Sequence, residues 1–266
     1  GAVDGNTETA SVNVDIPYLQ QGTNKLIRGT YLQARLDGIN RTSMLDLGTI
    51  LPGKNNTDVD VGLSAFGNGD KLRANVNWDL NRPKKYTGDV AMEMSASKGN
   101  DNSRSFGLHI LPSKFHVADA VWHIGDGNVS FDNGRLSVEN VSVWHKDQFV
   151  NIHGYASKDP DDTLTVDLSD IDLDYLFETL NINYVTFGGR ATGKAVARSL
   201  FDLKTMDAHT EGLKVTTLTY NGGRLGDAEL SGRWDPQEMK VAIGADITDE
   251  GHRSALIDGG VWVKRD

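Results

Sequence analysis

The sequence has no cysteine and no long apolar run, and each absence excludes a kind of site or a class of protein. Without cysteine the chain has no disulfide, no thiolate nucleophile and no thiolate-bound metal. No stretch of about 18 apolar residues exists, which is the length that a transmembrane helix needs. No signal peptide is visible, and the chain begins at Gly1. We interpret Gly1 as a cleavage scar, and the rest as a piece excised from a longer protein whose anchor was removed.

Positive charge is also in short supply. The chain has 27 Lys and Arg residues against 37 Asp and Glu residues, a net charge of -10 and a pI near 5.1. An acidic surface repels phosphate backbones, so we expect no nucleic-acid partner. The 266 residues suffice for one large β domain or two smaller ones. The expected division is an N-terminal β segment, 1–112, and a continuing β segment, 113–266, or one continuous domain.

The pattern that the sequence does contain is alternation of apolar and polar residues. The clearest run is Leu72, Ala74, Val76, Trp78 and Leu80, with a polar residue between each pair. Successive side chains of a strand point to opposite faces, so such a run has one apolar and one wet face. Comparable runs lie at 12–16, 32–36, 90–94, 106–110, 164–168, 239–247 and 261–263. The fold class predicted is all-β, an elongated, meandering antiparallel sheet.

Turn signals separate these runs. Glycine is abundant at 29 residues, and Asn133-Gly134 and Asn221-Gly222 suit the positive φ angles of tight hairpins. Each pair lies in a copy of one repeated pattern, 129–136 and 218–225, and a shorter version occurs at 185–190. The repeat favours a strand–turn–strand meander, or reflects only that hairpins reuse similar turns.

One segment departs from the period of two. Leu173, Leu176, Phe177 and Leu180 fall at helical spacing, preceded by aspartates that can cap a helix. This spacing predicts a short helix near 172–179.

No catalytic or metal-binding constellation stands out. The histidine pairs His116/His123 and His145/His153 are read as half-exposed strand residues rather than metal ligands. The acidic run 159–162 lacks the glycine and bidentate glutamate of a calcium loop, and is predicted to be an acidic turn. No nucleophile elbow, zinc-protease motif, phosphate loop or dinucleotide fingerprint occurs. We therefore expect no enzyme activity, no cofactor and no metal.

Four stretches in the second half of the chain carry a family resemblance. They are WHIGDGNVSFDNGRLSVENVSV at 122–143, QFVNIHGYAS at 148–157, DTLTVDLSDIDLDYLF at 162–177 and VTFGGRATGKA at 185–195. Their order is strand pairs, a short helix and a Gly-Gly-Arg strand. This segment resembles the TamB family of AsmA-like bacterial envelope proteins, in the form found in Bacteroidetes.

The resemblance implies a long periplasmic protein anchored in the inner membrane, of which this chain is an internal segment. It implies a sheet curled into an apolar groove that moves phospholipid between membranes or assists outer-membrane protein assembly. The partners implied are phospholipid acyl chains and, through the parent chain, an outer-membrane barrel protein. The matching motifs belong to the scaffold, so no catalytic residue is carried over.

A groove built this way needs lining residues, and the apolar faces of the alternating runs supply candidates. These are Leu72, Val76, Trp78, Met92, Met94, Phe106, Leu108, Val241 and Ile243. The same faces fit an ordinary closed core. Two other functions remain open from the sequence: a structural module whose edge strands stack on neighbouring segments, and a carbohydrate-binding protein that stacks sugars on Trp122, Trp144 and Trp234.

Overall fold

Antiparallel strands make up nearly all of the computed structural model, which describes residues 2–4, 8–21, 24–52, 58–69, 71–80, 86–98, 104–117, 120–174 and 186–262. The predicted all-β class is confirmed. The chain forms two units, Gly1–Asp126 and Gly127–Asp266. No described helix is long and apolar enough to span a membrane.

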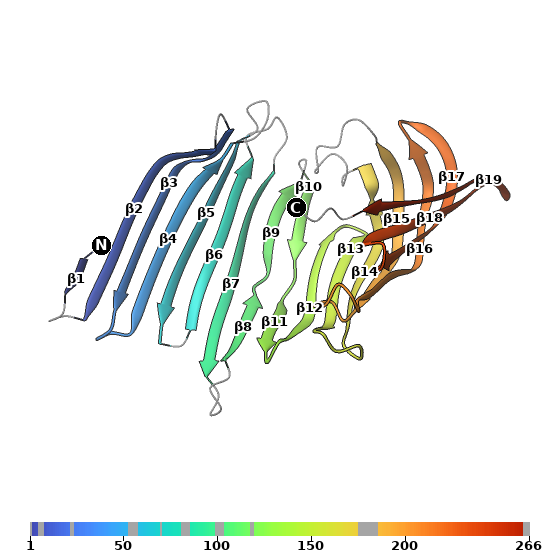
Figure 1. Ribbon diagram of the computed structural model, residues 1–266. Helices are drawn as coiled ribbons and strands as arrows, with labels where there is room; N and C mark the ends of the chain where they lie inside the picture. The colour runs from blue at the N-terminus through green and yellow to red at the C-terminus, as the bar shows by residue number, and fades with distance from the viewer. Residues whose placement is uncertain are drawn as a thin grey trace. The chain divides into compact units, whose positions relative to one another are not determined.

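Unit 1 is a meander of neighbouring strands (Figure 1). Each strand from β2 to β7 pairs antiparallel with the next, β1 pairs with the start of β2, and β9 pairs with β7 and β10. The strands are β1 (Ala2–Asp4), β2 (Thr9–Gln21), β3 (Asn24–Asp37), β4 (Thr42–Leu51), β5 (Val59–Asn68), β6 (Lys71–Leu80), β7 (Thr87–Lys98), β8 (Arg104–Ile110), β9 (Ser113–Val117) and β10 (Ala120–Ile124).

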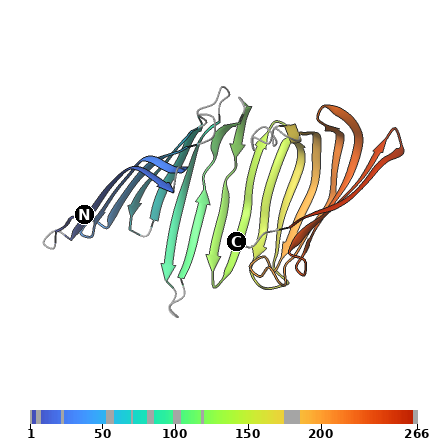
Figure 2. The ribbon, with the colours of Figure 1, turned by 45° about the horizontal axis from the view of Figure 1, so that its top comes forward.

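Unit 2 is also a meander, and its strands are strongly curved (Figure 2). Each strand from β11 to β18 pairs antiparallel with the next. The strands are β11 (Gly127–Asp132), β12 (Arg135–His145), β13 (Gln148–Ala156), β14 (Thr163–Asp172), β15 (Phe187–Arg198), β16 (Asp207–Tyr220), β17 (Gly223–Asp235), β18 (Lys240–Asp249) and β19 (His252–Trp262).

The alternating runs from 12 to 168 lie in strands β2, β3, β6, β7, β8 and β14. The run 239–247 lies in β18 except for Met239, which precedes the strand. Of the run 261–263, Val261 lies in β19 and Val263 lies outside the described residues. The two Asn-Gly pairs form the predicted hairpin turns, with φ of 48° and 78° at Asn133-Gly134 and 46° and 80° at Asn221-Gly222. These angles belong to a type I′ turn, whose twist matches that of the flanking strands. The two full copies of the repeat are therefore hairpins, whereas the shorter copy enters β15 without a turn.

The predicted helix falls largely outside the described residues. Asp172 is the last residue of β14, and Leu173 and Asp174 take up helical conformation directly after it. The rest of the segment 172–179 lies outside the residues that the structure describes.

Irregular strand pairing is frequent in the curved unit. Register shifts interrupt the pairing of β12 with β13, β14 with β15, and β15 with β16, near positive-φ residues such as Asn140, Asp170 and Gly193. Such bulges increase local twist and bend a strand. In unit 1 the pairing shifts between β2 and β3 and between β3 and β4, and it runs without a shift from β4 through β8.

The densest packing lies in unit 2. Val215 and Ile247 are each 1% exposed, and they cluster with Ala191, Leu218 and Ala228. Partly buried side chains pack on this cluster: Ile171, Leu173, Phe187, Leu225, Leu230 and Ala255. In unit 2, one side of the sheet is therefore covered by other side chains and forms a closed core.

Candidate functional site

The strongest candidate site is one apolar face of unit 1. Because these strands pair without a register shift along the stretches 10–14, 32–36 and 43–47 and from β4 to β8, apolar residues line up in rows that run across the strands. One row runs Val14, Leu32, Leu47, Leu63, Val76 and Val90, from β2 to β7. The next runs Val12, Ala34, Leu45, Ala65, Ala74, Met92 and Ile110, from β2 to β8. We call the side of the sheet that carries these rows the apolar face.

A third row extends the apolar face toward the other end of the strands. It runs Ala10, Leu36, Ser43, Gly67, Leu72, Met94 and Leu108. The opposite side of the same strands, which we call the polar face, carries residues of mixed character. One of its rows runs Ser11, Arg35, Met44, Phe66, Arg73, Glu93 and His109. The two faces therefore differ sharply although the same strands build both.

Much of the apolar face is open. Leu36 is 56% exposed, Phe106 51%, Val12 43% and Met94 41%. The fully buried residues among these rows are the small Ala65 and Ala74, which their larger neighbours shield. Isolated exposed apolar residues are ordinary, but a contiguous apolar patch marks a binding surface.

Three aromatic rings lie at one end of the apolar face, and we call Trp78, Phe115 and Trp122 the aromatic ladder. The Trp78 ring lies over Gly88, where an added Cβ would come within 2.1 Å of the indole. The Trp78 and Phe115 ring centroids are 6.1 Å apart, and those of Phe115 and Trp122 are 6.2 Å apart, with the latter rings stacked. Offset stacking at this separation is favourable and stiffens the ring positions.

Seven of the nine candidate lining residues meet on this apolar face. Leu72, Val76 and Trp78 share β6, Met92 and Met94 lie opposite them on β7, and Phe106 and Leu108 follow on β8. The other two candidates, Val241 and Ile243, lie on β18 in unit 2.

Sequence reasoning missed the part of the apolar face on β4 and β5. Leu45 and Leu47 on β4 and Leu63 on β5 are members of the rows described above. Alternation is present there, but Met44 and Phe66 place large apolar side chains on the polar face and blur the pattern. The pairing of β5 with β6, whose alternation is clear, shows which residues of β5 and β4 lie on the apolar face.

In unit 2, Val241 and Ile243 share a sheet face with Ala245 and Ile247 of the closed core. Val241 borders an apolar hollow of about 380 Å³, together with small residues such as Ala195 and Ala208. Trp234 also borders it, and its indole nitrogen donates to the Leu203 carbonyl at 3.0 Å. Ile243 is 41% exposed. This face is thus closed at Ile247 and partly open at the other two residues.

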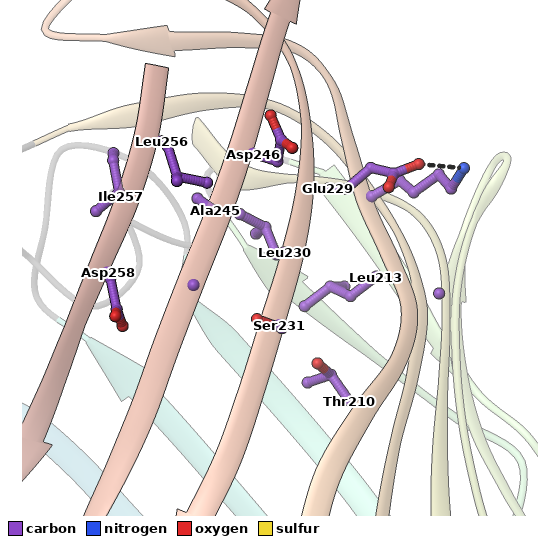
Figure 3. A pocket seen from close by; sticks show the side chains of 13 residues that line it. Thr210, Leu213, Glu229, Leu230, Ser231, Ala245, Asp246, Leu256, Ile257 and Asp258 are labelled. Carbon is purple, nitrogen blue, oxygen red and sulfur yellow. Dashed lines mark ion pairs between the residues drawn. The ribbon is translucent and has the colours of Figure 1, made fainter. Parts of the chain in front are cut away.

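A second hollow, of about 610 Å³, lies over strands β16 to β19 and has a more polar lining (Figure 3). Lys214 and Glu229 form an ion pair of 2.8 Å at its rim. Asp246 is paired with Arg253, so these charges are largely neutralised within the sheet.

The histidines do not assemble a metal site in the part of the chain that the structure describes. His153 Nε2 lies 2.9 Å from Asp167 Oδ2 on the neighbouring strand, and His145 lies at the end of β12, opposite Gln148. His116 and His123 lie on the paired strands β9 and β10, and His116 Nδ1 is 3.3 Å from the Thr87 hydroxyl. Cross-strand polar pairs of this kind stabilise a sheet.

The three tryptophans considered for sugar stacking differ in accessibility. Trp122 is 8% exposed and Trp234 is 7% exposed, and both pack within their sheets. Trp144 is partly exposed on β12, opposite Phe149. Two of the three rings are thus unavailable to a sugar.

The acidic run 159–162 forms a turn, as predicted. Asp159 and Asp161 are exposed, and the Asp161 amide donates to the Asp159 carboxylate at 2.9 Å. Asp162 is buried and bound by Arg135 and Ser157.

Comparisons with known proteins give no further guide to this site. No family model, no curated protein and no solved structure matches the chain.

Proposed function

We propose that this chain is a non-enzymatic segment of a cell-envelope protein that shields or conducts phospholipid between membranes. The apolar face of unit 1 is the working surface. The observation that carries the proposal is the unbroken apolar row from Val14 to Val90, which crosses six paired strands.

The chemistry of the face suits a hydrocarbon chain. Each methylene that moves from water to an apolar surface gains about 0.8 kcal/mol, and the gain requires no directional contact. The lining is aliphatic and aromatic, and Met92 and Met94 add flexible side chains that adapt to an irregular ligand. A non-directional surface of this kind holds acyl chains without fixing one position, as transport requires.

The dimensions of the face also suit an acyl chain. Residues 72 to 80 of β6 span about 27 Å at the usual strand rise. One leaflet contributes roughly 15 Å of a bilayer's hydrocarbon core. An acyl chain can therefore lie along a strand entirely within the apolar face.

The resemblance of residues 122–195 to the TamB family supports the rest of the proposal. It favours a periplasmic location, a parent protein anchored to the inner membrane, and a contribution to outer-membrane protein assembly through a barrel partner. Fractionation of cells that produce the parent protein tests the location.

Two phenylalanines of unit 1 provide a matched test of the working surface. Phe106 is 51% exposed on the apolar face, and Phe66 is 56% exposed on the polar face. A photo-crosslinking phenylalanine analogue at position 106 is expected to capture phospholipid in cells, as detected by mass spectrometry. The same analogue at position 66 is expected to capture none. Equal capture at both positions, or none at position 106, would sink the proposal.

A further inference from the structure

Strand β19 is an edge strand of unit 2 that exposes four large apolar side chains. Within that unit, and among the described residues, β18 is the one strand that pairs with it. Leu256 is 69% exposed, Trp262 62%, Val261 59% and Ile257 51%. Figure 3 shows Leu256, Ile257 and Asp258 along β19, beside β18.

These four apolar side chains lie on both faces of β19. Ile257 and Val261 share the face of Ala245 and Val241, whereas Leu256 and Trp262 share the opposite face with Asp246 and Lys240. A solvent-facing edge usually carries lysine, proline or a bulge that blocks further pairing. From Ala255 to Trp262 this strand has no lysine, proline or bulge, Asp258 is its one charged residue, and its register with β18 is unbroken.

The sequence of β19 is self-complementary about Gly259. In an antiparallel pair of two identical strands, each residue of one copy lies opposite one residue of the other copy, and the two residue numbers add up to the same sum in every pair. With Gly259 opposite itself, Leu256 lies opposite Trp262 of a second copy, and Ile257 lies opposite Val261. Each pair occurs twice, so every exposed apolar side chain of the strand gains an apolar partner.

Other registers lose this match. Centring on Asp258 places two aspartates opposite each other, and like charges in that position destabilise a sheet. Centring on Ile257 places Leu256 opposite Asp258, and centring on Gly260 places Asp258 opposite Trp262. A register shifted by one residue would join one sheet face of the first copy to the opposite sheet face of the second copy.

Local geometry permits close approach at the centre. A Cβ added to Gly259 would meet no atom within 4 Å. Asp258 would lie opposite Gly260, so its carboxylate keeps access to water.

We propose that β19 is a self-association edge, at which two copies of this chain pair antiparallel about a two-fold axis at Gly259. The pairing joins the two unit 2 sheets into one, with Ile257 and Val261 of both copies on the same side. This inference does not depend on lipid binding by unit 1.

Charge placed on the two-fold axis tests the pairing. Light scattering of the full chain is expected to show a concentration-dependent dimer. Gly259→Asp and Gly259→Lys each set like charges opposite each other, and each is expected to weaken dimerisation roughly tenfold or more. An equal mixture of the two variants is expected to restore dimers as mixed pairs. The control Asn133→Asp adds the same charge in the exposed turn between β11 and β12, where Asp-Gly also suits a type I′ turn, and is expected to dimerise normally.

Three outcomes would overturn the proposal: a wild-type chain that stays monomeric at every concentration, Gly259 variants that dimerise normally, or a mixture that shows no recovery. Open-ended polymers would also contradict it, because a two-fold contact closes on itself. Phospholipid capture at position 106 is expected to be unaffected by Gly259→Asp, so failure of either proposal leaves the other readout intact.

Discussion

The Arg135 guanidinium donates hydrogen bonds from two of its nitrogens to the Asp162 carboxylate. Arg135 Nε lies 3.0 Å from both carboxylate oxygens, and one terminal nitrogen lies 2.6 Å from Oδ1. The Ser157 hydroxyl donates to the other oxygen at 2.7 Å, and the guanidinium lies 3.9 Å from the Tyr155 ring centroid. This contact ties the start of β12 to the acidic turn that links β13 and β14.

The contact predicts how stability depends on pH. Hydrogen bonds from Arg135, and next from Ser157, hold the pKa of Asp162 below its usual value. A lowered pKa in the folded state stabilises the fold fully above the unfolded-state pKa of about 3.9, and this contribution is lost as the pH falls through the folded-state pKa. Urea unfolding is therefore expected to become easier on acidification below about pH 4.

Asp162→Asn is expected to lower stability at neutral pH and to flatten its dependence on acid pH. Asp161→Asn, at an exposed position in the same turn, serves as the control. Equal acid sensitivity of the wild type and Asp162→Asn would contradict the assignment.

Core packing in unit 2 predicts a contrast between two isoleucines on one strand. Ile247 is 1% exposed and Ile243 is 41% exposed, and both lie on the same face of β18. Ile247→Ala is expected to cost about 2–5 kcal/mol of unfolding free energy, because it removes buried contacts and leaves a cavity. Ile243→Ala is expected to cost less than about 1 kcal/mol, because much of that side chain already faces solvent.

Chemical denaturation followed by circular dichroism measures both isoleucine variants. Equal losses for the two would mean that the core does not extend as described.

The alternation rule explains why the strands were predictable and their alignment was not. The run from Leu72 to Leu80 identifies β6 from sequence alone, because every second residue is apolar. That Val76 meets Leu63 and Val90 depends on turn lengths and pairing register, which no single strand encodes. Seven candidate residues were therefore identifiable as apolar-face residues, but their assembly into rows became visible only in the sheet.

The irregular features of unit 2 were harder to predict. Bulges such as those at Asn140 and Asp170 place ordinary polar residues at positive φ, without the glycine that would mark them. The closed core at Ile247 depends on Leu173 and Phe187, which are distant in sequence. The alternation of apolar residues within a strand does not predict which other segment of the chain covers that strand.

The aromatic ladder predicts that Gly88 cannot carry a side chain. A Cβ there would overlap the Trp78 ring, so Gly88→Ala is expected to displace the indole from Phe115 at a cost of about 1–3 kcal/mol. Near-ultraviolet circular dichroism reports the ring packing, and urea unfolding reports the cost.

Gly107→Ala is the control for Gly88→Ala, because the new methyl would meet only the Ser95 hydroxyl, at 2.7 Å on the polar face, and this small side chain can rotate away. Its effect is expected to stay within about 0.5 kcal/mol. An unchanged aromatic spectrum in Gly88→Ala would contradict the ladder.

Adjacent residues of β7 separate lipid binding from folding. Met94 is on the apolar face between Leu72 and Leu108, and Ser95 is on the polar face between Lys71 and Gly107. Both are exposed, so a glutamate at either position is expected to leave the fold intact. At position 94 its carboxylate would have to lose water when an acyl chain covers it, which is strongly unfavourable. Met94→Glu is therefore expected to lower co-purified phospholipid several-fold, and Ser95→Glu to leave it unchanged. Thin-layer chromatography of lipid extracts, normalised to protein, measures the difference, and retention of lipid by Met94→Glu would argue against the apolar face as the binding surface.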